Sequence, residues 1–216
     1  MSQAEHKTVK HLGLKLLAAA LLLTAATFLW TSSNYKTDNI TQDTWVDDAG
    51  QLHVLGLTLG KTTLRNAEIA LKSRSDIALY IYPEEHPEAG LKLEAFFPAI
   101  ADHSKVIMQL HADEASLKQM QQRSTLPHLY PNKVARMNLH PEDLAIAKTM
   151  IVKNLTLLPS IDITPETLKG RFGEASSITN SEDGTTYYHF TAIGLKASIK
   201  PEDVTRLEFN NPGRAH

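Results

Sequence analysis

Cysteine is absent from all 216 residues of this chain. Its absence excludes disulfides, thiolate metal sites, cysteine nucleophiles and a lipidated N-terminal cysteine. An excess of basic charge is also missing, because 22 Lys and Arg stand against 24 Asp and Glu, so nothing predicts nucleic-acid binding. With 42% apolar and 21% charged residues, the composition is that of a folded protein, which excludes a wholly disordered or multi-span membrane chain.

One long hydrophobic run interrupts this average composition. Residues 16–30 carry no charge, and together with residues 12–15 they approach the ~20 residues that a helix needs to cross a bilayer. Lys7, Lys10 and Lys15 lie at its start, so the positive-inside rule predicts a cytoplasmic N-terminus and an exported remainder. The sequence thus predicts a single-pass anchor in a bacterial inner membrane and a periplasmic C-terminal domain. The anchor residues are Leu12, Leu16, Leu21, Phe28 and Trp30.

A cleaved signal peptide is the alternative interpretation of the same run. Small residues suited to cleavage are present at 24–26 and at 31–33. Both interpretations place the functional part outside the cytoplasm. Without residues 1–30 the chain keeps 19 basic and 23 acidic residues, a net charge of −4.

An internal duplication is indicated by two pairs of matching segments. The segment 63–65 matches 167–169, and 90–92 matches 194–196, both at a shift of 104 residues. The expected fold class is α+β, with an N-terminal transmembrane helix and two tandem repeats, each a helix plus an antiparallel sheet. The expected parts are a cytoplasmic N-terminus 1–11, the helix 12–30, a linker 31–51, a first repeat 52–123, a connecting segment 124–158, a second repeat 159–212 and a tail 213–216.

Hydrophobic periodicity and capping residues predict the individual elements. Thr164 and Pro165 open a helix that Gly173 ends. Alternating apolar residues, as at Val106 and Met108, are typical of half-buried strands. Helices are expected near 62–73, 113–123, 141–150 and 165–172, and strands near 77–82, 91–97, 105–112, 133–139, 151–158, 185–190, 194–199 and 204–209.

The run ITPETLKGRFGEA, from Ile163 to Ala175, resembles the small outer-membrane assembly lipoproteins. These domains share a helix-plus-antiparallel-sheet fold with β-lactamase inhibitor protein. Tyr187 and Tyr188 occupy the position of the family's Tyr-rich hairpin, and the resemblance covers residues 160–210, with a looser match over 55–110. The missing cysteine excludes lipoprotein anchoring, so the resemblance implies a fold and, by analogy, an assembly role.

No motif predicts catalysis, a cofactor or a metal. The stretch from Gly56 to Thr62 has three residues between its glycines, one fewer than a phosphate-binding loop, and is expected to be a strand and turn. The histidines show no metal-binding spacing on a helix face and are expected in loops and at helix starts. The pairs that place histidine beside carboxylates include Asp102–His103 and His111–Asp113, and Glu84, Glu85 and Glu88 form an acidic cluster.

Tyrosines on the predicted strands supply the candidate partner surface, because tyrosine is enriched at protein interfaces. The residues are Tyr80, Tyr82, Tyr187 and Tyr188. The function predicted from the sequence is a non-catalytic interaction or assembly subunit that binds other bacterial envelope proteins and is attached to the membrane by its N-terminal helix. Two alternatives stay open: an enzyme or small-ligand binder with a cleft between the repeats, built from His103 or His111 with Asp102, Glu84 or Glu88, and a structural single-helix subunit of a membrane complex.

Overall fold

The structure is a computed structural model that describes residues 44–86 and 88–212, together with Leu17, Ala20, Thr24 and Thr27. These last four residues are helical, and the Thr24 hydroxyl donates a hydrogen bond to the Ala20 carbonyl at 3.0 Å. Among the described residues, no helix has both the length and the apolar character needed to span a membrane. The remainder of the predicted anchor 12–30 lies outside the described residues, including Leu12, Leu16, Leu21, Phe28 and Trp30.

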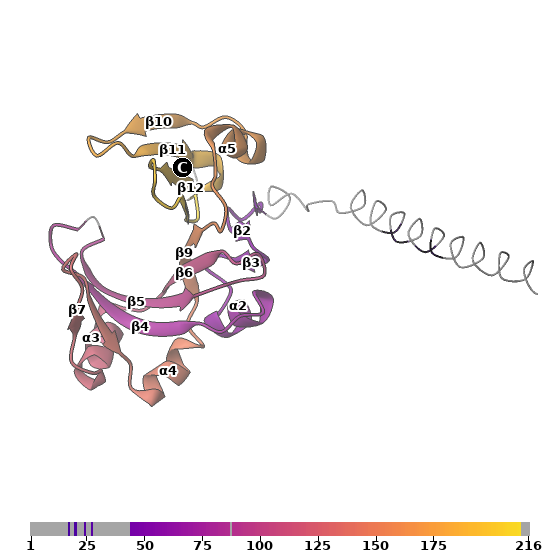
Figure 1. Cartoon of the computed structure of the whole chain (residues 1–216). Helices are drawn as coiled ribbons and strands as arrows, with labels where there is room; N and C mark the ends of the chain where they lie inside the picture. The colour runs from indigo at the N-terminus through magenta and orange to yellow at the C-terminus, as the bar shows by residue number, and fades with distance from the viewer. Residues whose placement is uncertain are drawn as a thin grey trace, which may run out of the picture. The chain divides into compact units, whose positions relative to one another are not determined.

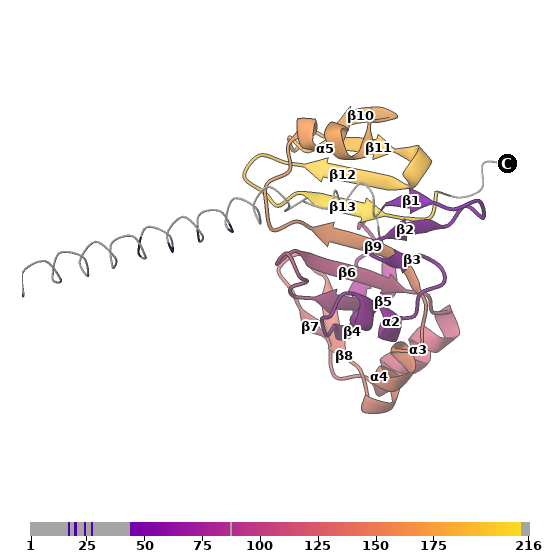
Figure 2. The same cartoon turned by 90° about the vertical axis from the view of Figure 1, so that its right-hand side faces the viewer.

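A ten-stranded antiparallel sheet forms the framework of the unit that contains residues 44–212. Its strand order is β10-β11-β12-β13-β9-β6-β5-β4-β8-β7, and most of this succession can be followed in Figure 2. The strands are β4 (Asp76–Tyr82), β5 (Gly90–Phe97), β6 (Lys105–Leu110), β7 (His128–Leu129), β8 (Ala135–Asn138), β9 (Val152–Leu158), β10 (Ser177–Asn180), β11 (Thr186–Phe190), β12 (Leu195–Ile199) and β13 (Arg206–Phe209).

Side chains alternate between the two faces of this sheet, as the two-residue period of a strand requires. On β5, Leu93, Ala95 and Phe97 are buried on one face, while Glu94 and Phe96 belong to the other. The buried face is completed by the alternating apolar residues of the neighbouring strands and forms one continuous core. The opposite face is largely polar and holds the candidate site.

Four α-helices supply apolar side chains to this core: α2 (Leu64–Ala70), α3 (Glu114–Arg123), α4 (Pro141–Ala147) and α5 (Pro165–Phe172). Each begins at a side-chain cap that accepts a hydrogen bond from a backbone N–H of the first turn. In α5 the cap is Thr164, Pro165 follows it, and Gly173 ends the helix with a φ of 81°. These three roles match the prediction from the sequence. Figure 1 shows α2, α3 and α4 on the convex side of the bent strands β4 and β5.

A second, three-stranded sheet covers part of the core. It consists of β1 (Trp45–Val46), β2 (Leu52–Val54) and β3 (Leu57–Thr58). Asn211 joins it to the chain after β13, because its side chain accepts a hydrogen bond from the Leu52 N–H at 2.8 Å and donates one to the Leu59 carbonyl at 3.1 Å. Residues 44–51, which end the predicted linker 31–51, contain β1 and the turn that follows it.

The predicted fold class is wrong. The described unit is mostly antiparallel β-sheet, with one ten-stranded and one three-stranded sheet, rather than an α+β pair of helix-plus-sheet repeats. The cause is β9, which pairs with β6 on one side and β13 on the other, so strands of both expected repeats join a single sheet. The helix match at the 104-residue shift is also out of register: Thr63 is the N-cap of α2, whereas Thr167 lies inside α5.

Individual elements agree better with the sequence than the architecture does. Helices α2, α3, α4 and α5 and most long strands lie where periodicity and caps predicted them. The strands without a prediction are β1, β2, β7 and β10, each of two to four residues. Segments of this length are too short for an alternating pattern to stand out.

Candidate functional site: a groove across the ten-stranded sheet

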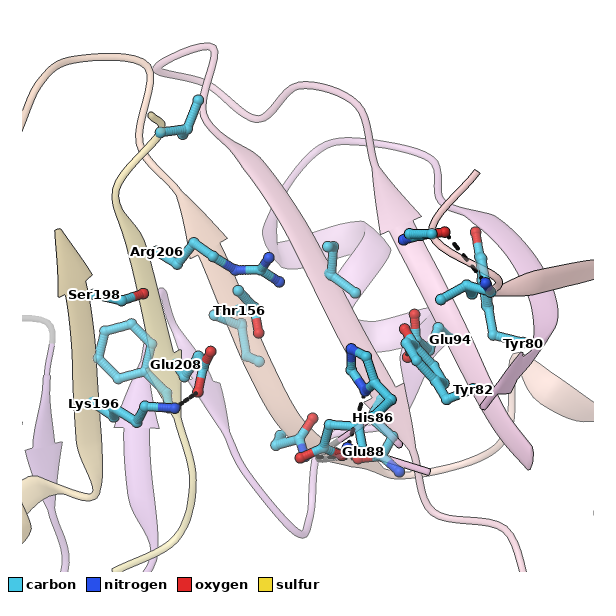
Figure 3. Close-up of a pocket in the computed structure, with 18 of the residues that line it drawn as sticks. Tyr80, Tyr82, His86, Glu88, Glu94, Thr156, Lys196, Ser198, Arg206 and Glu208 are labelled. Atoms are coloured by element: carbon cyan, nitrogen blue, oxygen red, sulfur yellow. Dashed lines mark hydrogen bonds and ion pairs between the residues drawn. The ribbon is translucent and has the colours of Figure 1, made fainter. Parts of the chain in front are cut away.

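A groove of about 660 Å³ crosses the polar face of the ten-stranded sheet. Figure 3 shows side chains from several strands directed into it. Its floor and walls come from seven strands, β4, β5, β6, β9, β13, β12 and β11. It exists because the sheet is continuous: strands contributed by distant parts of the chain pair in order, and their outward-facing residues line one surface.

Aromatic side chains line the wall formed by β4 and the neighbouring loops. Tyr80 and Tyr82 lie two residues apart on β4, with ring centroids 6.4 Å apart. The His86 ring lies 4.7 Å from that of Tyr82, and Tyr130 also lines the groove. This wall offers flat aromatic surfaces with polar hydroxyl groups, a combination suited to protein contacts.

A partly buried carboxylate lies beside these rings. Oε1 of Glu94 on β5 accepts a hydrogen bond from the Tyr82 hydroxyl at 2.8 Å. Burial raises the pKa of Glu94, and the Tyr82 hydrogen bond opposes that shift. Burial and the nearby Glu94 charge also raise the pKa of Tyr82 far above its usual range. Tyr82 therefore remains a hydrogen-bond donor at neutral pH.

The opposite wall carries basic side chains on β12 and β13. Lys196 forms an ion pair with Glu208 at 3.2 Å, and its ammonium lies 4.9 Å from the centroid of the Tyr187 ring. Arg206 also lines the groove, and its side chain points toward the space between the walls in Figure 3. In the described part of the chain, no carboxylate forms an ion pair with Arg206.

Neutral polar groups occupy the middle of the groove. Asn154 on β9 donates a hydrogen bond to the Gln109 side chain on β6 at 2.7 Å. Thr156 lies one pleat further along β9, paired with Ile107 on one side and Glu208 on the other. The groove thus has an aromatic and acidic wall, a neutral floor and a basic wall.

Three of the four predicted surface tyrosines meet in this groove. Tyr80, Tyr82 and Tyr187 all line it, although β4 and β11 lie far apart in the sheet order. Tyr188 does not, because it is the strand neighbour of Tyr187 and faces the other side, where it packs against the core. The pairing register confirms the division, with Tyr187 opposite Ser198 and Tyr188 opposite Ala197.

The structure does not gather the histidines and carboxylates of the alternative ligand site. Glu88 lines the groove, but Glu84, Asp102, His103 and His111 do not. Asp102 instead accepts hydrogen bonds from the backbone and side chain of Ser104. Among residues 44–86 and 88–212, no group of three or more metal-ligating side chains converges on a point.

The glycine-flanked stretch at 56–62 has the strand and turn expected of it. Leu57 and Thr58 form β3, and Thr58 N–H donates a hydrogen bond to the Thr62 hydroxyl at 2.9 Å. The backbone of residues 60–62 then bonds to Val152 in both directions. These backbone groups form hydrogen bonds within the fold and do not surround an anion.

A polar array that the sequence did not suggest lies on the three-stranded sheet. Asp47 Oδ2 is 3.2 Å from His53 Nε2, and His53 Nδ1 is 3.1 Å from the Thr58 hydroxyl. Trp45 stacks on His53 with ring centroids 3.8 Å apart. The residues meet because His53 pairs with Trp45 across one strand boundary and with Thr58 across the next. They lie outside the groove, and the array ties the β1–β2 turn to β3.

Glu94 and Arg206 are among the groove residues that sequence reasoning missed. Each is an ordinary charged residue at an outward position of a strand, and neither belongs to a motif. Only strand pairing shows that the two line one cavity. Comparison of the chain with protein-family models, curated proteins and solved structures gave no match, so the resemblance to the assembly lipoproteins stays a prediction.

Proposed function

We propose that residues 44–212 form a protein-binding domain that receives a segment of another bacterial envelope protein in this groove, as a non-catalytic accessory or assembly subunit. The observation that carries the proposal is the gathering of Tyr80, Tyr82, Tyr130 and Tyr187 from separate parts of the chain around one open groove. Tyrosine supplies large contact area at a low cost in side-chain entropy, which is why it is frequent at protein interfaces.

Exposed apolar residues next to the groove support a macromolecular partner. Leu126 and Leu129 are 91% and 66% exposed, and they belong to the same segment as Tyr130. Leu129 lies on β7, which ends the sheet and has one edge without a neighbour among the described strands. Apolar residues gathered at an exposed edge favour contact with another chain.

The proposed extracytoplasmic location is supported by the N-terminal sequence. An apolar run preceded by basic residues directs export whether it is kept or cleaved. An envelope protein is therefore the partner class that the domain is expected to meet.

Site-specific photo-crosslinking in the native host tests the proposal. A benzophenone amino acid is introduced at Tyr130 or Tyr187 in the groove and, as a matched control, at Ile69, which is 69% exposed on α2 and outside the groove. We expect both groove positions to form one adduct of defined mass that the control does not form. Failure of both groove positions to form an adduct, or the same adduct at Ile69, would contradict the proposal.

A further inference from the structure

The charged residues of the groove specify the chemistry of a partner more closely than its aromatic residues do. Glu94 is partly buried, and its only hydrogen bond within the described chain comes from Tyr82. The basic side chain two positions before it, Lys92, pairs with Glu88 instead. Glu94 is thus a partly buried carboxylate without a direct ion pair among the described residues, and the charges of Lys92 and Arg206 favour its ionised form only from a distance. A cation that contacts it directly would stabilise it further.

The surroundings of Glu94 suit a cationic side chain. The Tyr82 ring lies beside those of Tyr80 and His86, at 6.4 and 4.7 Å between centroids. Cations are attracted to tyrosine rings, and more strongly when water is excluded. A lysine or arginine entering here meets both a carboxylate and aromatic rings.

Arg206 is the corresponding feature of the other wall. Its basic neighbours on this wall are already neutralised, Lys196 by Glu208 at 3.2 Å and Lys200 by Asp183 at 3.1 Å. The guanidinium of Arg206 has no such partner among residues 44–86 and 88–212. Its planar set of donors suits a carboxylate that approaches from outside the chain.

Strand order sets the separation of the two strands that carry Glu94 and Arg206. Arg206 lies on β13 and Glu94 on β5, with β9 and β6 between them. Three strand spacings amount to roughly 14 Å along the sheet. An extended peptide spans this distance with about four residues, so one short segment can reach both charges.

We propose that the groove recognises its partner through a mixed-charge segment, in which a lysine or arginine binds Glu94 and an aspartate or glutamate about four residues away binds Arg206. The inference rests on the proposed protein-binding function and specifies the partner's chemistry. Because Glu94 and Arg206 oppose each other across the groove, the segment binds in one direction only. A uniformly acidic or basic segment would leave one of the two charges against a like charge.

Short synthetic peptides test this directly with the full-length chain kept in mild detergent. The probes are five-residue peptides with Lys and Glu at their ends, in both orders, a counterpart with Gln at both ends, and one with Lys at both ends. Binding is measured by NMR titration. We expect one order of the mixed-charge peptide to bind about tenfold more tightly than the Gln peptide.

Variants test whether Glu94 and Arg206 cause this binding preference. Glu94→Gln and Arg206→Gln should each remove most of the preference for the mixed-charge peptide, whereas Lys118→Gln, on the exposed side of α3, should leave it unchanged. Equal binding of all the peptides, including no detectable binding of any, overturns the charge assignment. That result would leave the photo-crosslinking test of the protein-binding function intact, so the two proposals fail separately.

Discussion

The Tyr82 hydroxyl donates a 2.8 Å hydrogen bond to the Glu94 carboxylate across the β4–β5 strand pair. The bond connects the aromatic wall of the groove with its buried acid. It also holds Glu94 in place while burial makes the charged form of this carboxyl less favourable. Glu94 therefore affects both the stability of the fold and the proposed recognition of a partner. Its titration should change the free energy of unfolding.

The contribution of Glu94 to the stability of the folded chain should fall as the pH rises. Burial raises the pKa of Glu94 in the folded state, opposed by hydrogen bonding from Tyr82 and by the charges of Lys92 and Arg206, and assisted by Glu88. A raised pKa means that the folded state holds the proton more tightly, so this contribution is present at low pH and is lost as the pH rises through the folded value. Urea unfolding from about pH 4 to about pH 7 should show Glu94→Gln gaining stability relative to the native chain. A difference that stays constant over this range would count against the assignment.

Arg123 should be important for stability because it neutralises a buried acid. Asp143 on α4 is fully buried and pairs with Arg123 of α3, while its second oxygen, Oδ2, has no hydrogen-bond partner in the described structure. Replacing Arg123 by Gln leaves this charge uncompensated and should cost about 3 kcal/mol of unfolding free energy. Lys118→Gln on the same helix, where the side chain is exposed, should change it by less than about 0.5 kcal/mol. Adding Asp143→Asn to the first variant should recover part of the loss, and equal effects of the two single variants would contradict this account.

Gly194 is required by the close approach of the chain after β13. It has a φ of +59°, and a Cβ placed on it would lie 1.9 Å from the Asn210 carbonyl oxygen. We expect Gly194→Ala to lower the unfolding free energy by about 3 kcal/mol through clash and backbone strain. Gly56→Ala is the matched control, because Gly56 has a φ of +73° with open space around it, and only the left-handed backbone, costing about 1 kcal/mol, is then unfavourable. Equal thermal unfolding of the two variants would disprove the role of the contact.

The two stretches predicted as repeats should not fold alone. The fragments 52–123 and 159–212 both lack β9, which pairs with β6 of the first and β13 of the second. Each fragment would expose an unpaired strand edge and part of the shared core. Circular dichroism should show no cooperative thermal transition for either fragment, in contrast to the full-length chain. A sharp transition in one of them would show that its repeat is an independent domain.

The sequence by itself determined the local structure of this protein. Helix caps such as Thr164 and Asp113, and the alternation of Val106, Met108 and Leu110, specify helices and strands through interactions within a few residues. Alternation along β5 likewise puts the side chains of Glu94 and Leu93 on opposite faces of the sheet. These are short-range effects, and for that reason the positions of the helices and long strands could be predicted.

Only the tertiary structure decided the architecture and the site. Nothing near β9 in the sequence shows that it pairs with both β6 and β13, because strand partners are chosen by the burial of a common core and not by local pattern. That pairing turned two expected repeats into one sheet, brought Tyr187 into the same groove as Tyr80 and Tyr82, and set Glu94 and Arg206 on facing walls. The groove results from the long-range order of the strands, whereas the face on which each lining side chain lies follows from local alternation along its own strand.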